Sequence, residues 1–159
     1  NKILINDYDI NDYKLSDIRK NIVYISQQEA LYNDTIRNNI ILERDITDEE
    51  FLLIAKLTRV DKILEKRNIN YDYFLEEGGV NLSGGERQRI ILARALLKKS
   101  NIILIDEGLN EIDSNLERNI LKDIFKYFYD KTFVIVSHRK DNSDLYNRII
   151  NINNGVVDA

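Results

Sequence analysis

The 159-residue chain is 43% hydrophobic and 31% charged, which is the composition of an ordinary folded domain or of part of one. Its net charge of −4 argues against a nucleic-acid partner, and the absence of cysteine excludes disulfides and thiolate metal sites. No apolar run approaches the ~18 residues that a membrane span needs.

The first third of the chain predicts two short strands and then a helical stretch. Residues 2–5 form the first expected strand, with a turn at 6–7, and residues 21–25 form the second, which ends at Ser26-Gln27. From 33 to about 77 the pattern becomes helical and shows no clear strand. The helices expected there cover 35–41, a segment that opens at 48 after the N-cap Thr47, and 60–66.

The second half alternates between helices and buried strands. Ser83 and Glu86 have the spacing of a capping box, which predicts a helix to about Lys99. Ser114 and Glu117 repeat that spacing and open a helix to about Tyr129. The apolar run 101–105 is typical of a central parallel strand covered on both faces. A further strand, 132–136, ends at Ser137-His138, and residues 148–157 predict a hairpin that turns at Asn153-Asn154-Gly155.

This alternation predicts an α/β fold: a mostly parallel sheet core, with a helical subdomain inserted into it. We expect the helical subdomain at approximately 28–82 and the α/β core at 1–27 and 83–159. In such sheets the ligand chemistry lies at the carboxyl ends of the strands. Four polar residues fall at those ends: Gln27, Asp106, Glu107 and His138.

Asp106 and Glu107 form a carboxylate pair at the end of the most apolar strand. Hydrolysis of a phosphoanhydride needs an oxygen ligand for Mg²⁺ and a base or positioner for water. We assign the first role to Asp106 and the second to Glu107. The alternative is a plain strand end that turns into solvent.

Ser83, Gly84 and Gly85 begin a helix, where backbone N–H groups attract anions and glycine lets a phosphate approach. The alternative is a simple capping box.

Gln27 could give a neutral oxygen to Mg²⁺ and report the nucleotide state, or be a polar loop residue. His138, the single histidine, could hydrogen-bond a γ-phosphate or hold Glu107, or be structural.

Over essentially its whole length the chain resembles the nucleotide-binding domain of exporter-type ABC transporters. Leu82-Ser83-Gly84-Gly85-Glu86 is similar to the signature motif of that family, and Ile105-Asp106-Glu107 to its Walker B motif. Gln27 stands in a segment like the Q-loop, and His138 at the switch histidine. Asn110 to Asp113 occupy the D-loop, and 77–81 resembles the exporter X-loop.

The resemblance implies an ATPase that uses ATP and Mg²⁺ and pairs head to tail with a second copy of the domain. It further implies a transmembrane domain, fused N-terminally, and a place on the cytoplasmic face of the cell membrane. In this picture Ser83 and Gly85 of one copy close on the γ-phosphate held by the other. An exported substrate, possibly a peptide, is expected.

Departures from the family qualify this expectation. No G-x-x-x-x-G-K-[ST] phosphate loop (Walker A) occurs, so the chain resembles a domain that is incomplete at its N-terminus and inactive on its own. Asn110 and Glu111 replace the usual Ser-Ala of the D-loop, and Glu76 stands where a glycine is usual. An alternative is therefore a non-catalytic remnant that only folds, dimerises or docks.

DNA-repair ATPases with the same motifs are excluded, because no heptad coiled coil separates Gln27 from Ser83.

Overall fold

The computed structural model describes residues 2–139, 141–153 and 155–158. The chain begins with a small antiparallel hairpin of β1 (Leu4–Ile5) and β2 (Tyr8–Asp9), joined at Asn6 and Asp7, which both have positive φ. The predicted turn is thus confirmed, and of the predicted strand 2–5 only Leu4–Ile5 forms a strand. A 3₁₀ turn (Ile10–Asp12) and α1 (Leu15–Asn21) follow. The sequence analysis did not predict α1, a helix of two turns without a capping side chain.

A three-stranded parallel sheet forms the centre of the molecule. It contains β3 (Ile22–Ser26), β4 (Ile102–Asp106) and β5 (Thr132–Val136), in the order β3-β4-β5. The register pairs Ser26 with Asp106 and Asp106 with Val136, so the three carboxyl ends meet at one edge. The predicted strands are confirmed, two of them displaced by one residue.

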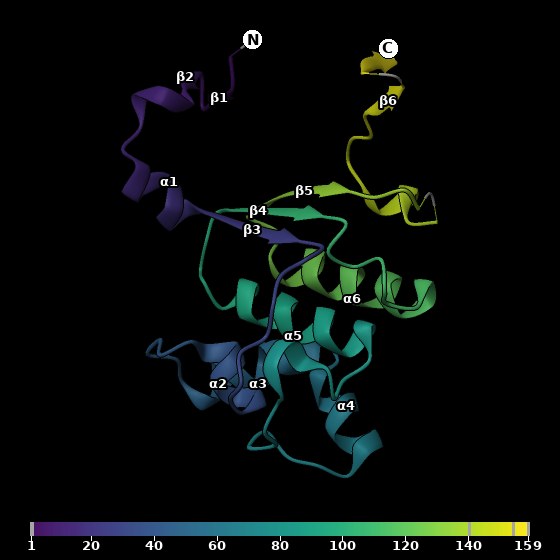
Figure 1. Cartoon of the computed structure of the whole chain (residues 1–159). Coiled ribbons are helices and arrows are strands. Elements are labelled where there is room, and N and C mark those ends of the chain that lie inside the picture. Colours follow the sequence, from purple (N-terminus) through teal and green to yellow (C-terminus); the bar gives the residue numbers. More distant parts are fainter. Residues whose placement is uncertain (1, 140, 154, 159) are drawn as a thin grey trace.

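Two helices cover one face of this sheet (Figure 1). These are α5 (Gly84–Leu96) and α6 (Ser114–Tyr127), and Phe125 of α6 meets Phe133 of β5 edge to face at 5.1 Å. Ile103 and Ile105 of β4 point to that face and are buried.

The prediction that the central strand is covered on both faces is wrong for the described residues. On the other face Tyr24, Val134 and Val136 are about half exposed, and Leu104 is only partly buried. Side chains alternate along a strand, and within the described residues only one of the two resulting rows packs under helices.

The helical part of the chain packs against α5 on the side away from the sheet (Figure 1). The predicted helices are confirmed as α2 (Ile36–Ile41), α3 (Asp48–Leu57) and α4 (Val60–Arg67), followed by a 3₁₀ turn at Glu77–Gly79. Thr35 caps α2, and Thr47 with Glu50 forms a capping box on α3. Strand pairing here is limited, among described residues, to one bridge between Thr35 and Phe74.

The ends of α5 and α6 differ slightly from the prediction. Helix α5 stops at Leu96 rather than near Lys99, and Lys99 itself has left-handed backbone. Helix α6 is capped by Asp113 and not by Ser114: the Asp113 carboxylate accepts from the amides of Asn115 and Leu116. An aspartate one residue earlier is simply the better-placed acceptor for the first-turn amides.

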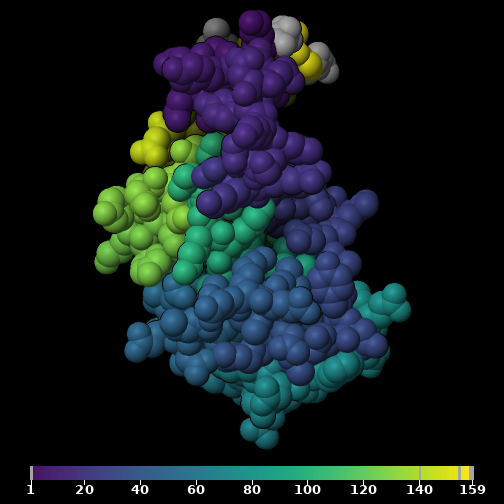
Figure 2. All heavy atoms as spheres, turned by 90° about the vertical axis from the view of Figure 1, so that its left-hand side faces the viewer, coloured from purple at the N-terminus to yellow at the C-terminus, as the bar shows by residue number. Residues whose placement is uncertain are grey.

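At the C-terminus a 3₁₀ turn (Ser143–Leu145) precedes an antiparallel pair, β6 (Asn151–Asn153) and β7 (Val156–Asp158). This pair confirms the predicted hairpin, although β6 begins at 151 and not at 148. Asn154 of the predicted turn lies outside the described residues. The N-terminal hairpin (purple) and the C-terminal segment (yellow) both lie at the end opposite α2–α4 (Figure 2), on different sides of it (Figure 1). No described helix has the length and apolar character to cross a membrane.

Candidate active site

Asp106 ends β4 and stands at the carboxyl edge of the sheet, in the row of side chains that faces away from α5 and α6. Its Oδ2 accepts a hydrogen bond of 2.8 Å from the Tyr24 hydroxyl on the neighbouring strand. That hydrogen bond, with lesser contributions from desolvation and from the charge of Asp106, raises the pKa of Tyr24. Tyr24 therefore remains a donor at neutral pH and holds the aspartate by one oxygen.

Glu107 follows with left-handed backbone, at a φ of 53°. This conformation is rare for a residue with a Cβ and takes the side chain out of the alternation of the strand. The Glu107 amide still donates to the Val136 carbonyl oxygen at 3.1 Å, so β5 supports the kink. At the carboxylate, His138 Nε2 lies 2.7 Å from Oε1, and the side-chain amide of Asn110 (Nδ2) donates to Oε2 at 3.1 Å. Both oxygens of Glu107 are thus oriented by neighbours.

The loop behind Glu107 is held by Arg139. Its guanidinium donates to the backbone oxygens of Asn110 and Ile112 and to the Glu117 carboxylate. Glu117 is buried and also accepts from Asn142 at 3.2 Å. One arginine therefore ties the segment after β5 to the segment after β4, and fixes His138 and Asn110 relative to each other.

Ser83 opens α5 with the predicted capping box. Its hydroxyl accepts from the Glu86 amide, and Glu86 Oε2 accepts from the Ser83 amide at 2.9 Å. Glu86 is buried and receives two further hydrogen bonds from Arg67 of α4, at 2.6 and 3.1 Å. Burial alone would raise the pKa of Glu86, but the hydrogen bonds and charge of Arg67 and the Ser83 amide outweigh it, and the pKa is lowered.

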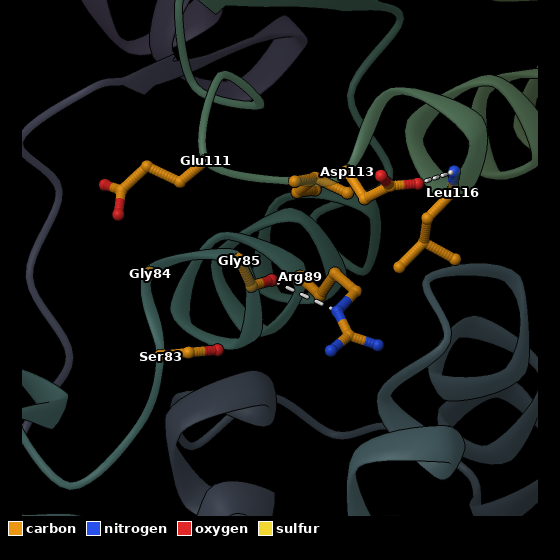
Figure 3. A pocket seen from close by; sticks show the side chains of 8 residues that line it. Ser83, Gly84, Gly85, Arg89, Glu111, Asp113 and Leu116 are labelled. Carbon is orange, nitrogen blue, oxygen red and sulfur yellow. Dashed lines mark hydrogen bonds between the residues drawn. The ribbon is translucent and has the colours of Figure 1, made fainter.

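A shallow cavity of about 270 Å³ opens at the start of α5. Ser83, Gly84, Gly85 and Arg89 line it on one side, and Glu111 to Asp113 and Leu116 on the other (Figure 3). The amides of Gly84 and Gly85 belong to the first helical turn, whose N–H groups have no acceptor within the helix. Together with the helix dipole they make an anion-attracting surface.

The two glycines also have a role within the chain. A Cβ on Gly85 would lie 2.8 Å from the Glu111 carbonyl oxygen, and one on Gly84 would overlap the Glu111 carboxylate. The lack of side chains at these positions lets the segment 110–113 pass directly over the helix start. From the sequence alone, these two glycines are explained only by the approach of a phosphate, and not by this packing of the chain on itself.

Gln27 follows β3 at the same sheet edge, and its side chain is exposed. The segment after it is anchored by Arg94 of α5, which donates to the Ala30 carbonyl oxygen and pairs with Glu29 at 3.5 Å. Burial raises the pKa of Glu29 against the opposing charge of Arg94. The structure thus brings Asn110 and His138 to the Glu107 carboxylate, while Asp106 is bonded to Tyr24 and Gln27 follows the neighbouring strand at the same sheet edge.

The donor set fits Mg²⁺ bound together with a nucleotide. Among the described residues, no three His, Cys, Asp or Glu side chains are grouped so as to hold a metal alone. Mg²⁺ is usually bound by one or two carboxylates together with substrate phosphates. The Asp106 carboxylate, which is only partly buried at the carboxyl edge of the sheet, matches that mode.

Two residues of the site were missed by sequence reasoning. Tyr24 could have been noted as a polar-tipped aromatic one step from the end of an apolar strand. Arg139 gives no local signal, because its partners are 22 to 29 positions away in the chain.

Comparison with known proteins relates the chain to one family and fold. A sequence model described as ABC transporter matches residues 1–110. The chain is 37% identical over 158 residues to an ATP-dependent lipid A-core flippase of Pseudoalteromonas translucida (strain TAC 125), covering 98% of this chain and 27% of the relative. A flippase of the same name from Pasteurella multocida (strain Pm70) is 36% identical, with the same coverage. The solved structure of a bacterial Atm1-family ABC exporter with ATP bound superimposes with a TM-score of 0.80 at 32% identity, covering 87% of this chain and 24% of that one. The chain spans about a quarter of the length of these proteins.

Proposed function

Since the chain belongs to the ABC transporter family, we propose that it is the larger, C-terminal part of an ATP-hydrolysing domain that powers export across a membrane. We place its α/β core at residues 1–27 and 83–159, with approximately 28–82 as the inserted helical subdomain. The proposal draws on a lipid A-core flippase and an Atm1-family exporter, which match 98% and 87% of this chain.

Each site residue receives a role from its position. Asp106 and Gln27 are the proposed ligands of Mg²⁺, which would neutralise charge on the phosphates of bound ATP. Glu107 orients the attacking water and accepts its proton, while His138 and Asn110 keep its carboxylate aimed. Gly84 and Gly85 present first-turn amides to a γ-phosphate, and Ser83 adds its hydroxyl.

We further propose that two copies pair head to tail, so that the serine–glycine loop of one closes on the nucleotide of the other. Asn110 and Asp113, next to this loop, would lie in the contact. A transmembrane domain, fused N-terminally, would place this domain on the cytoplasmic face of the membrane. For the exported molecule, the peptide proposed from the sequence gains no support from relatives named for lipid A.

The observation that carries the proposal is the position of the Glu107 carboxylate. His138 contacts one of its oxygens and Asn110 the other, and Asp106 precedes it at the carboxyl edge of a parallel sheet. An aimed carboxylate next to a candidate metal ligand is what water activation at a phosphate requires.

The test uses the chain extended upstream through a phosphate-binding loop of the family, here called the extended chain. Glu107→Gln should abolish turnover, retain ATP binding and accumulate an ATP-bound dimer, because glutamine keeps the shape but cannot take a proton. General-base catalysis typically supplies about 10²–10⁴-fold, so a variant that keeps more than about a tenth of the rate would refute the base role. If the unsubstituted extended chain neither hydrolyses ATP nor dimerises with it, the chain would be a non-catalytic module that only folds or docks.

A further inference from the structure

Glu111 places a negative charge on the part of the molecule that is proposed to receive a phosphate. Its carboxylate lies against Gly84, so closely that a Cβ on that glycine would overlap it. Glu111 lines the same cavity as Ser83 and Gly85, and Figure 3 shows its side chain extended above the start of α5. The carboxylate therefore lies beside Gly84, at the start of the helix that carries the first-turn amides.

The backbone of Glu111 is fixed, but its side chain is not. The Glu111 amide donates to Gln88 Oε1 at 2.8 Å, and its carbonyl oxygen packs over Gly85. The carboxylate, by contrast, has a loose ion pair with Arg87 at 3.6 Å, and the side chain is 49% exposed. It can leave Gly84 without moving the loop.

The other charged groups at the cavity are already engaged. Arg89 donates to the backbone oxygens of Gly85 and Arg59, and the Asp113 carboxylate caps α6. Arg87 donates to the Leu82 carbonyl oxygen as well as pairing with Glu111. Of the two acidic residues that line the cavity, Glu111 is thus the one whose carboxylate caps no helix, and Arg87 is the cation with which it can pair more closely.

A carboxylate and a phosphate compete for the same helix terminus, because both are stabilised by its dipole and exposed amides. We propose that Glu111 is a further residue of the nucleotide site: its carboxylate competes with the γ-phosphate carried by the second copy and thereby sets the ATP concentration at which the two copies close. On closure the carboxylate turns from Gly84 toward Arg87. This inference rests on the proposed function.

The experiment measures ATP-driven dimerisation of the extended chain by analytical ultracentrifugation, with Glu107→Gln present so that ATP persists. Glu111→Gln removes the charge and keeps the shape. It should lower the ATP concentration for half-maximal dimer by about threefold to tenfold at low salt, and by less at high salt. Glu111→Ala should act in the same direction, and affinity of the monomer for a fluorescent ATP analogue should stay unchanged.

Asp130→Asn is the matched control, since it removes an exposed carboxylate far along the chain, after α6. It should leave the dimerisation curve where it was. If Glu111→Gln and Glu111→Ala dimerise at the same ATP concentration as the parent, or need more ATP, the inference about Glu111 is wrong while the proposed function stands. If neither parent nor variants dimerise with ATP, the head-to-tail arrangement fails, and the inference fails with it.

Discussion

Substitution of Arg67 by alanine should destabilise the fold, because Arg67 supports the helix start that carries Ser83. The guanidinium makes two hydrogen bonds to the buried Glu86 carboxylate and one of 2.9 Å to the Asn81 carbonyl oxygen. Removal of one partner of a buried ion pair costs about 3–5 kcal/mol. Arg67 retains 31% side-chain exposure and Glu86 keeps its bond from the Ser83 amide, so we expect a loss of about 2–3 kcal/mol at pH 7.

The loss should depend on pH. The folded-state pKa of Glu86 is below its ordinary value of 4.5, so its contribution to stability is present above that value and is lost as pH falls through the lower folded pKa. Without Arg67, burial would raise the pKa of Glu86 instead. The stability difference between parent and variant should therefore shrink at acidic pH.

Urea unfolding of the 159-residue chain at pH 7 and at about pH 4 measures both effects. Lys62→Ala, on the same helix, removes an exposed pair with Glu65 and should change the stability very little. An Arg67→Ala loss no larger than that of Lys62→Ala, or one that is equal at the two pH values, would refute the assigned role of the Arg67–Glu86 pair.

The 159-residue chain alone should neither hydrolyse ATP above background nor bind it with micromolar affinity in calorimetry, since no phosphate-binding loop is present in its sequence. In the extended chain, Ser83→Arg should leave the ATP affinity of the monomer unchanged, as measured by fluorescent-nucleotide titration. It should block ATP-driven dimerisation, as measured by sedimentation. A variant that loses ATP affinity and still dimerises would contradict the proposed contact between copies. Gly85→Ala should lower the midpoint of thermal unfolding, because its Cβ would clash with the Glu111 carbonyl oxygen, at a cost in stability of about 1–3 kcal/mol. A midpoint equal to the parent's would show that the loop 110–113 moves away without cost.

Much of the fold follows from local sequence patterns. The strands 102–106 and 132–136 are short apolar runs, and Thr47 and Ser83 carry capping signals three residues before a glutamate. Helix α1 was missed because it is short and uncapped. The uncovered sheet face was missed because an apolar strand does not reveal what packs on each of its sides.

The site was predictable where its residues follow strand ends, and less so where contacts cross between loops. Asp106, Glu107 and His138 could be placed together because parallel strands end at one edge. The hold of Asn110 on Glu107 depends on the left-handed turn at Glu107, which the sequence does not announce. The position of Glu111 over Gly84 likewise arises only when the loop 107–113 folds back on α5.

The backbone at Glu107 has one consequence for how this position can evolve. Left-handed backbone costs a residue with a Cβ roughly 1–2 kcal/mol, a cost that glycine does not carry. Glycine here would relieve that cost but would lose the contacts that the carboxylate makes with His138 and Asn110. If Glu107 activates water as proposed, the strained backbone is retained for the carboxylate that it presents at the end of β4.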